Sequence, residues 1–383
     1  MAASDDPFSR QSVERLVAQY GSPLLIVDAE RVRQHYCRLA AALPGVDLHY
    51  ALKPLPHPAV VRVLGAEGAF FDLATSGEVD MVRKAGIAPE RCIHTHPIKR
   101  DSDIRTALNF GVRTFVADNP DEIRKFIKYR NRASLLIRVA FRSPDATCDL
   151  SRKFGCEPGA VAALLQLAAE QQVTVEGLSF HVGSQTATSG MYVEAIRTCR
   201  DLLLQAVQAG HALRTLDIGG GFPADYVADS APIEAFCAPI IAALATLPPG
   251  LRLIAEPGRY IVAPAAIAVA TVMGRALRDE QWWYYLDDGL YGSYSGQLFD
   301  HASFPLEALK GATEQFPSVL AGPTCDSIDV IAENIALPHL DIGDLIVGRS
   351  MGAYTWASAT DFNLFPKAMV LALDRGRLMT EDE

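Results

Sequence analysis

The feature of this sequence that most restricts its fold is a regular alternation, from residue 46 to residue 256, of short apolar β-forming segments with longer segments of helical periodicity. This alternation is typical of parallel sheets, because each parallel strand needs a crossover helix before the next one. Eight strand–helix units predict an α/β fold, a (β/α)₈ barrel, with functional groups at the carboxyl ends of its strands. The expected strands are 47–52, 69–73, 91–95, 113–117, 135–140, 177–182, 215–218 and 252–255.

The character of the sequence changes after Glu256, where helical periodicity fades and short β-like runs follow. These runs predict a second, all-β domain at the C-terminal end. The apolar run 23–27 precedes the first barrel helix and is expected to pair with that domain. We therefore expect a barrel over 28–262 and a β domain built from 1–27 and 263–383. The β-like runs are 266–273, 282–286, 344–347 and 368–373.

Composition and charge favour a soluble globular protein with small-molecule partners. Hydrophobic residues make up 49% of the chain and charged residues 21%, which is ordinary for a globular protein. Lys and Arg total 35 against 45 Asp and Glu, a net charge of −10, so nucleic acid and anionic membranes are poor partner predictions. The seven cysteines are scattered and never spaced as C-x-x-C, which favours reduced thiols in the cytoplasm over a disulfide framework.

Polar residues or glycines stand at the end of almost every expected barrel strand. A lysine in such a place is ordinarily a solvated loop charge. Lys53, however, follows an apolar strand end, and desolvation at a barrel mouth would lower the pKa of its amine and suit it to react with a carbonyl cofactor. The strand-end residues are Lys53, Asp72, His94, Asp118, Arg138, His181, Gly219 to Gly221 and Glu256.

The segment 216–222, Leu-Asp-Ile-Gly-Gly-Gly-Phe, takes a strand into three glycines, whose N–H groups can approach a phosphate closely. A permissive turn explains the run equally well, but barrels often bind phosphate after their seventh and eighth strands. Glu256 is suited to keep a pyridine nitrogen protonated and Arg259 to bind phosphate, with a rim salt bridge as the alternative interpretation. His181 could lie on an aromatic cofactor with Ser184 donating to its phosphate, or be a satisfied core histidine.

Together these residues resemble the fold-type III pyridoxal 5′-phosphate (PLP) decarboxylases, the group that contains the ornithine, lysine, diaminopimelate and arginine decarboxylases. Each motif is weak alone, but eight of them in family order are highly specific, and the likeness is closest to the ornithine/lysine branch. The motifs are Tyr50-Ala51-Leu52-Lys53, Phe71-Asp72-Leu73-Ala74, His181-Val182-Gly183-Ser184, Gly219-Gly220-Gly221-Phe222-Pro223, Glu256-Pro257-Gly258-Arg259-Tyr260, Asp288-Gly289-Leu290-Tyr291-Gly292, Gly322-Pro323-Thr324-Cys325-Asp326 and Gly352-Ala353-Tyr354-Thr355.

The resemblance implies PLP as the cofactor and assigns roles to the residues that match the motifs. Lys53 is expected to form the internal aldimine, Glu256 to bind the pyridine nitrogen and His181 to stack on the ring. Supporting positions around the cofactor fall to Asp72, Glu78 and Arg138. The phosphate group is expected to be held by Ser184, Gly220, Gly221, Arg259 and Tyr354.

The resemblance also implies decarboxylation of a basic L-amino acid, ornithine or lysine, to the diamine and CO₂. Two carboxylates, Asp300 and Asp326, suit a distal ammonium group and would repel the second carboxylate of diaminopimelate. Tyr291 and Phe299 are expected to line the same pocket, and Cys325 to return a proton to Cα. Cys325 and Asp326 are expected to reach the neighbouring subunit's site, so the implied working unit is a homodimer with shared active sites.

Departures from the family pattern at Pro54-Leu55, Phe299 and Trp356 leave the substrate open. The alternatives are a specialised decarboxylase acting on a modified amino acid or diaminopimelate, a racemase, and a non-catalytic regulatory homologue. The last predicts erosion of the cofactor residues, which are all present here. His94 and His96 lie two residues apart but have no evident third ligand, so no metal site is expected.

Overall fold

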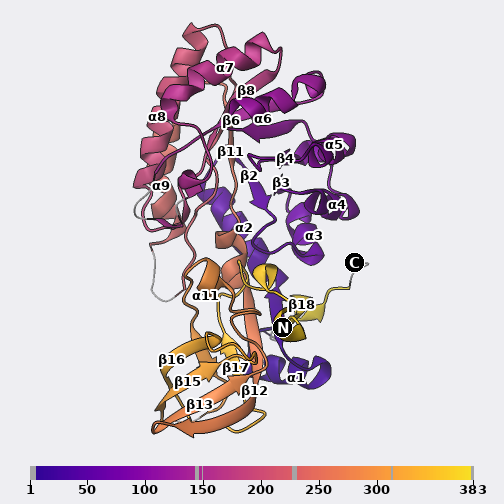
Figure 1. The fold of residues 1–383 in the computed structure, drawn as a ribbon, viewed down its shortest axis with the longest axis vertical. Helices are drawn as coiled ribbons and strands as arrows, with labels where there is room; N and C mark the ends of the chain where they lie inside the picture. Colours follow the sequence, from indigo (N-terminus) through magenta and orange to yellow (C-terminus); the bar gives the residue numbers. More distant parts are fainter. Residues whose placement is uncertain (1–5, 143–145, 149, 227–230, 312–313, 381–383) are drawn as a thin grey trace. The chain divides into compact units, whose positions relative to one another are not determined.

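The computed structural model describes residues 6–142, 146–148, 150–226, 231–311 and 314–380. The chain divides into two compact units (Figure 1). The β unit comprises Met1–Gln34, Ala224–Asp229 and Arg259–Glu383, and the barrel unit comprises His35–Pro223 and Ser230–Gly258. The chain therefore passes between units at 34/35 and 258/259, where the sequence suggested 27/28 and 262/263. The segment 224–229 is a further excursion that no periodicity signalled.

The barrel unit is built around eight parallel strands that close in the order β10-β11-β2-β3-β4-β5-β6-β8. Both faces of these strands are largely buried, which explains their nearly unbroken apolar runs. All eight expected strands are present, so the predicted α/β barrel is confirmed. The strands are β2 (Val46–Ala51), β3 (Phe70–Leu73), β4 (Cys92–His94), β5 (Thr114–Ala117), β6 (Ser134–Val139), β8 (Thr174–Phe180), β10 (Thr215–Asp217) and β11 (Arg252–Ala255).

Helices alternate with these strands, and two of them begin at the capping signals that the sequence contains. Thr75 accepts a hydrogen bond from the Glu78 N–H at 3.3 Å, and Asn119 accepts one from the Glu122 N–H at 3.0 Å. A short two-stranded sheet of β7 (Ala146–Cys148) and β9 (Ser184–Thr186) was not expected. The helices are α2 (Ala29–Ala42), which begins in the β unit, α3 (Pro58–Ala66), α4 (Ser76–Lys84), α5 (Asp101–Phe110), α6 (Pro120–Lys125), α7 (Val161–Glu170), α8 (Gly190–Gln208) and α9 (Ile233–Leu244).

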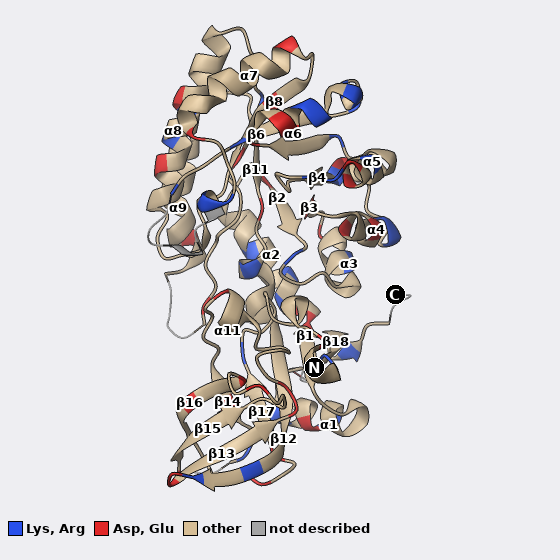
Figure 2. Cartoon of the chain, viewed as in Figure 1, with Lys and Arg blue, Asp and Glu red and all other residues tan. Residues whose placement is uncertain are grey.

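Charges of both signs are interspersed along the barrel helices (Figure 2). Arg100 pairs with Asp103 in α5 and Arg124 with Asp121 in α6, each one helical turn apart. Arg124 and Asp121 are both exposed, and such an exposed pair contributes little to stability, whereas the Arg100 partner Asp103 is buried. Among the described residues no helix combines the length and the apolar character needed to cross a membrane.

The β unit joins the two ends of the chain in one sheet. In β1 (Leu24–Asp28), Leu24 pairs with Val269 of β12 (Ala266–Arg278) on one side and with Met369 of β18 (Met369–Asp374) on the other. This confirms the predicted pairing of the N-terminal run. The unit is not purely β, because it also contains α1 (Arg10–Tyr20), α10 (Arg259–Val262) and α11 (Gly296–Phe299). Its other strands are β13 (Gln281–Leu286), β14 (Leu306–Ala308), β15 (Phe316–Ala321), β16 (Val330–Leu337), β17 (Leu345–Gly348) and β19 (Arg377–Leu378).

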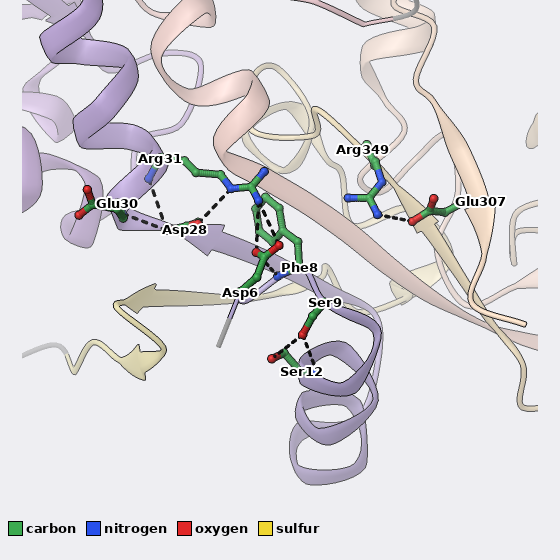
Figure 3. A network of polar contacts seen from close by, with 9 residues as sticks. All are labelled: Asp6, Phe8, Ser9, Ser12, Asp28, Glu30, Arg31, Glu307 and Arg349. Carbon is green, nitrogen blue, oxygen red and sulfur yellow. Dashed lines mark hydrogen bonds and ion pairs between the residues drawn. The ribbon is translucent and has the colours of Figure 1, made fainter. Parts of the chain in front are cut away.

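An arginine in α2 ties the start of the described chain to β1 (Figure 3). Arg31 Nε lies 3.1 Å from Asp28 Oδ2, and Nη2 lies 3.2 Å from Asp6 Oδ1. Its guanidinium also sits 4.3 Å from the centre of the Phe8 ring. These contacts fix the chain just ahead of α1. A separate exposed pair, Arg349 with Glu307, joins β14 to the residue after β17.

Candidate active site

The predicted functional residues of the barrel unit lie at the carboxyl ends of its strands. Lys53 follows β2, Asp72 lies in β3, Arg138 in β6, His181 follows β8 and Glu256 follows β11. Because the strands are parallel, their carboxyl ends share one end of the barrel. All except Lys53 and Arg138 are buried, and Arg138 is half-buried. The barrel thus gathers these chemically different groups at one mouth.

Lys53 differs from the expectation, because its side chain is exposed in the chain alone. It lies two residues beyond the end of β2, in a turn whose flanking residues Leu52 and Leu55 are fully buried. The Tyr50 hydroxyl donates to the Leu55 carbonyl at 3.1 Å, which anchors the turn from below. Pro54, one of the departures from the family pattern, occupies the space that a Cβ on Gly258 would need. The lysine therefore projects from a turn that buried residues anchor on both sides.

Three buried carboxyl groups, Asp72, Asp217 and Glu256, face the positive charges of Lys53 and Arg138. Burial, followed by the charge of Glu256, raises the pKa of Asp72 well above its usual range, while Lys53 lowers it. Burial and then Asp217 raise the pKa of Glu256 well above its usual range, against the lowering effects of Lys53 and Arg138. Burial raises the pKa of Asp217 to about 6, and a hydrogen bond from the protonated Glu256 carboxyl stabilises its ionised form.

These carboxyl groups hold protons more tightly than ordinary ones because three ionised carboxylates in one buried mouth would repel one another. Burial and Asp217 therefore favour the protonated form of Glu256, whereas Lys53 and Arg138 favour the ionised form. Asp217 also accepts the Gly219 N–H at 2.9 Å, so the same carboxylate fixes the glycine turn and contacts Glu256.

His181 is an uncharged imidazole that accepts a hydrogen bond from the backbone. Its Nδ1 accepts the Gly183 N–H at 3.1 Å, which requires the remaining ring proton to be on Nε2. Burial, and then the charges of Lys53 and Arg138, lower the pKa of His181 well below its usual value. A neutral imidazole in this place can pack against a flat ring without bringing a further charge into the mouth.

The glycine turn after β10 is held by its carbonyl groups. The Tyr192 hydroxyl donates to Gly220 O at 2.8 Å, and Thr186 Oγ1 donates to Gly221 O at 3.1 Å. Among the described residues, no hydrogen bond leads from the N–H of Gly220 or Gly221 to a protein acceptor. A Cβ on Gly220 would lie 2.5 Å from Glu256 O and 3.2 Å from His181 Nε2. The turn is therefore a close-packed cradle with donors available to an anion.

Two further predicted residues of the barrel unit have clear structural settings. Glu78 accepts the Ala74 N–H at 2.5 Å at the start of α4, so its carboxylate is used in capping that helix. Ser184 is half-buried at the start of β9, where it pairs with Cys148 of β7. Glu78 thus has a backbone partner and a pKa that burial raises and Lys53 lowers. Ser184 is held in position by a strand pairing that the sequence did not predict.

The β unit places Arg259 and Asp300 together, although the sequence assigned them to different ligands. Arg259 Nη1 donates to the Tyr226 hydroxyl at 2.7 Å, and Nη2 pairs with Asp300 Oδ2. The guanidinium lies 4.6 Å from the centre of the Tyr354 ring. Burial alone would lower the pKa of Arg259, but Tyr226, Asp300 and Tyr354 raise it overall. The guanidinium is thus a buried, permanently charged anion site.

The other predicted substrate residues of the β unit lie around one loop. The Tyr291 hydroxyl donates to the Asp326 carboxylate, and its ring stacks on Phe362 with centres 4.3 Å apart. The Cys325 N–H donates to Asn363 Oδ1 at 3.0 Å. Two side chains therefore fix the loop that carries the thiol and the carboxylate. Phe299 lies elsewhere, 62% exposed at the end of α11.

Sequence reasoning missed four residues that support these groups: Asp217, Tyr192, Tyr226 and Asn363. Asp217 could have been suspected, because a carboxylate inside an apolar strand just before the glycine run needs a partner. Tyr192 lies in a helix 28 residues before the carbonyl that it contacts, and Tyr226 lies outside any periodic segment. Their roles depend on long-range contacts, which leave no local pattern.

The burial of Asp217 makes a prediction about stability and pH. Its pKa is about 6 in the folded chain, above its ordinary value of 3.8, so the ionised form opposes folding and stability falls as pH rises through this window. Asp217→Asn keeps an acceptor for Gly219 and should remove a penalty of up to about 3 kcal/mol at about pH 7.5, and little at about pH 4. Urea unfolding of the cofactor-free proteins measures this. A difference in the free energy of unfolding between the two proteins that does not change with pH would contradict the prediction.

The residues at the barrel mouth fit PLP. The glycine cradle offers N–H donors to a phosphate, and a side chain on Gly220 would not fit. The neutral His181 ring is suited to an aromatic face, and the proton-retaining Glu256 to a ring nitrogen. Lys53 supplies a primary amine whose charge acts on both of these side chains. Among the described residues there is no cluster of three side chains arranged to bind a metal ion.

Comparisons with known proteins agree with this site. The family model of the pyridoxal-dependent decarboxylases, pyridoxal binding domain, matches residues 29–263. The lysine/ornithine decarboxylase of Selenomonas ruminantium is 36% identical over 93% of this chain and 91% of its own length. Antizyme inhibitor 2 of Xenopus laevis is 35% identical over 90% of this chain and 79% of its own length.

Solved structures resemble the chain over nearly its whole length. The crystal structure of the lysine/ornithine decarboxylase of Vibrio vulnificus with putrescine is 55% identical, has a TM-score of 0.91 and covers 96% of this chain and 98% of that one. The same enzyme with cadaverine gives a TM-score of 0.92, over 95% and 98% of the two chains. With the barrel, the site residues and these likenesses together, the chain belongs to the fold-type III PLP-dependent decarboxylases, in their ornithine/lysine branch.

Proposed function

We propose that this protein decarboxylates a basic L-amino acid, ornithine or lysine, to the corresponding diamine and CO₂. One observation carries the proposal: an amine, a neutral imidazole and a proton-retaining carboxyl group interact at one glycine-lined barrel mouth. The groups are Lys53, His181 and Glu256. The Vibrio vulnificus relative, solved with both putrescine and cadaverine, supports a substrate range that includes both amino acids.

Each residue of the barrel mouth has a distinct part in holding the cofactor. When bound, PLP supplies an electron sink for the bond that breaks at Cα. Lys53 would bind its aldehyde carbon, Glu256 would hold a proton at its ring nitrogen, and His181 would cover one ring face. Asp72 and Arg138 set the charge around Lys53 and Glu256. The phosphate group would be held by Ser184, Gly220, Gly221, Arg259 and Tyr354.

The β unit contributes the residues that would bind the substrate and return a proton to its Cα. Asp326, oriented by the Tyr291 hydroxyl, would bind the distal ammonium group together with Asp300, and Phe299 would line the pocket. Cys325 would give its thiol proton to Cα after CO₂ has left. The Asn363 amide fixes the backbone of that thiol, so the proton is delivered from a defined direction.

A panel of amino acids tests the proposed function. With PLP present, ornithine and lysine should release CO₂ and yield diamines, whereas diaminopimelate should react at least roughly tenfold more slowly because its distal carboxylate faces Asp326. Release of CO₂ from each L-amino acid and the chirality of recovered substrate are measured. Preferred turnover of diaminopimelate, or racemisation without CO₂ release, would overturn the assignment, and inertness towards every substrate would favour the regulatory alternative.

We also propose that the working unit is a homodimer in which Cys325 and Asp326 serve the partner's site, within the cytoplasm. Exposed apolar side chains near this loop in the β unit support an interface, including Ile328 at 52% and Leu364 at 88% exposure. The six cysteines whose side chains the structure describes are free thiols, which suits a reducing compartment.

Shared sites make a prediction about mixed variants. Lys53→Ala and Cys325→Ala proteins, each inactive alone, should recover roughly a quarter of the wild-type activity when their subunits are exchanged, because half of the dimers are mixed and each has one intact site. Activity is followed after mild dissociation and reassociation. Two Lys53→Ala preparations mixed with each other serve as the control, and a mixture that stays inactive would place each site within a single chain.

A further inference from the structure

The Arg259 site of the β unit holds an anion that belongs to the protein itself. The guanidinium pairs with the Asp300 carboxylate, and the side chains of the two residues are only 5% and 14% exposed. The second arm of the guanidinium donates to the Tyr226 hydroxyl, and the ring of Tyr354 covers it. A buried arginine thus has its anion-binding capacity taken up by a carboxylate from α11's C-terminal end.

Asp300 cannot serve its proposed substrate while it is bound in this way. A carboxylate that neutralises Arg259 has little potential left for a distal ammonium group, and it occupies the Nη2 donor that a bidentate phosphate would use. Phosphate is the stronger competitor, because it carries close to two negative charges and three acceptor oxygens. Two proposed functions of the site therefore depend on breaking the same ion pair.

The segment that carries Asp300 is short and partly exposed. Asp300 terminates a helix of only four residues, through a hydrogen bond from its N–H to Gly296 O at 3.0 Å. The next residue, His301, has a left-handed φ of 50°. Leu298 and Phe299 are exposed, so a turn of this segment buries or exposes little apolar surface. Phe304, buried and in edge contact with Tyr226, remains as the anchor.

We propose that Asp300 is an internal competitor for phosphate at Arg259, and that phosphate displaces it and so frees its carboxylate for the ammonium group of the substrate. Binding of a phosphate group at Arg259 thus frees Asp300 for the basic side chain. The first half of the proposal, the displacement of Asp300 by phosphate, concerns Arg259 and any phosphate monoester or inorganic phosphate. The second half rests on the proposed function, because it needs a basic substrate.

Inorganic phosphate tests the first half in the full-length protein freed of PLP. Asp300→Asn should bind phosphate at least about tenfold more tightly than wild type, since the competing charge is gone, and Asp300→Glu should return the affinity towards the wild-type value. Arg259→Met should lose binding. Calorimetry measures each affinity, and the rise in unfolding temperature with phosphate provides a second readout. Unchanged or weaker phosphate binding by Asp300→Asn would overturn the proposal.

Two controls identify the source of the effect. Glu307→Gln removes a carboxylate from another arginine of the same unit, Arg349, and should leave phosphate affinity unchanged (Figure 3). Pyridoxal, which lacks the phosphate group, should bind wild type and Asp300→Asn alike, whereas PLP should bind the variant more tightly. A gain for pyridoxal equal to that for PLP would mean that Asp300 acts on the ring site and not on Arg259.

Coupling between phosphate and a diamine tests the second half. In wild type, saturating phosphate should raise the affinity for 1,4-diaminobutane several-fold, and the diamine should raise the phosphate affinity by the same factor. In Asp300→Asn the coupling should vanish. Absence of coupling in wild type, or of diamine binding under both conditions, would overturn this half. If phosphate behaves as expected but no amino acid is decarboxylated by the PLP-loaded enzyme, the proposed function fails and the competition at Arg259 stands.

Discussion

Lys53→Ala is expected to lower decarboxylation by at least roughly a thousandfold, because it removes the amine that would bind the cofactor's aldehyde carbon. The visible absorption of the lysine-bound cofactor should disappear with it, while PLP can still be retained by the phosphate and ring contacts. The turn that carries Lys53 is anchored by buried Leu52 and Leu55, so the variant should fold normally.

Lys53→Arg tests the positive charge of Lys53 separately from its primary amine. It keeps a positive charge beside Asp72, Glu78 and Glu256, whose pKa values Lys53 lowers, but it has no primary amine. This variant should be as inactive as Lys53→Ala. Lys84→Ala, on the exposed end of α4, should leave turnover and spectrum unchanged. Stopped-flow spectra and CO₂ release provide the measurements, and a persistent visible band in Lys53→Ala would show that another amine binds the cofactor.

Glu256→Gln is expected to lower kcat by roughly a hundred- to a thousandfold, with a smaller change in KM. An amide can still contact a ring nitrogen, but it cannot balance a positive charge there, so the cofactor becomes a poorer electron sink. The buried carboxyl of Glu256 can take either form, because burial and Asp217 favour its protonated form, whereas Lys53 and Arg138 favour the ionised form that balances such a charge.

The matched control for this change is Glu176→Gln. Glu176 lies near the start of β8, away from the carboxyl ends of the barrel strands, and accepts a hydrogen bond from Thr114 at 2.6 Å. Its replacement should reduce stability modestly and leave kcat intact. Steady-state kinetics with ornithine and lysine decide the matter: equal losses of kcat in both variants would mean that Glu256 acts only through stability.

The order of the barrel strands was predictable because their signal is local. Each strand is mostly buried, so it reads as a short apolar run, and two of the helices that follow begin at capping residues, Thr75 and Asn119. β14 to β16 gave weaker signals. Their faces are partly exposed, as in β16, and their pairings are set by partners far along the chain.

The site was predictable as a set of residue types and not as a set of contacts. Lys53, His181, Glu256 and the glycine turn could be placed at one mouth, since parallel strands bring their carboxyl ends together. Asp300 and Arg259 could not be joined from sequence. They stand 41 residues apart, and each was assigned to a different ligand, whereas the folded β unit pairs them.

What the amino-acid order determined by itself is the alternation of buried strands and capped helices, and the chemical groups that stand where each strand ends. Only the tertiary structure decided which of those groups share a proton or a charge. Asp217 interacts with Glu256, Arg259 is neutralised by Asp300, and the charge of Lys53 acts on Asp72 and Glu256. The reason is physical: periodicity records burial residue by residue, whereas a pKa or an ion pair depends on distances between side chains that only the folded chain sets.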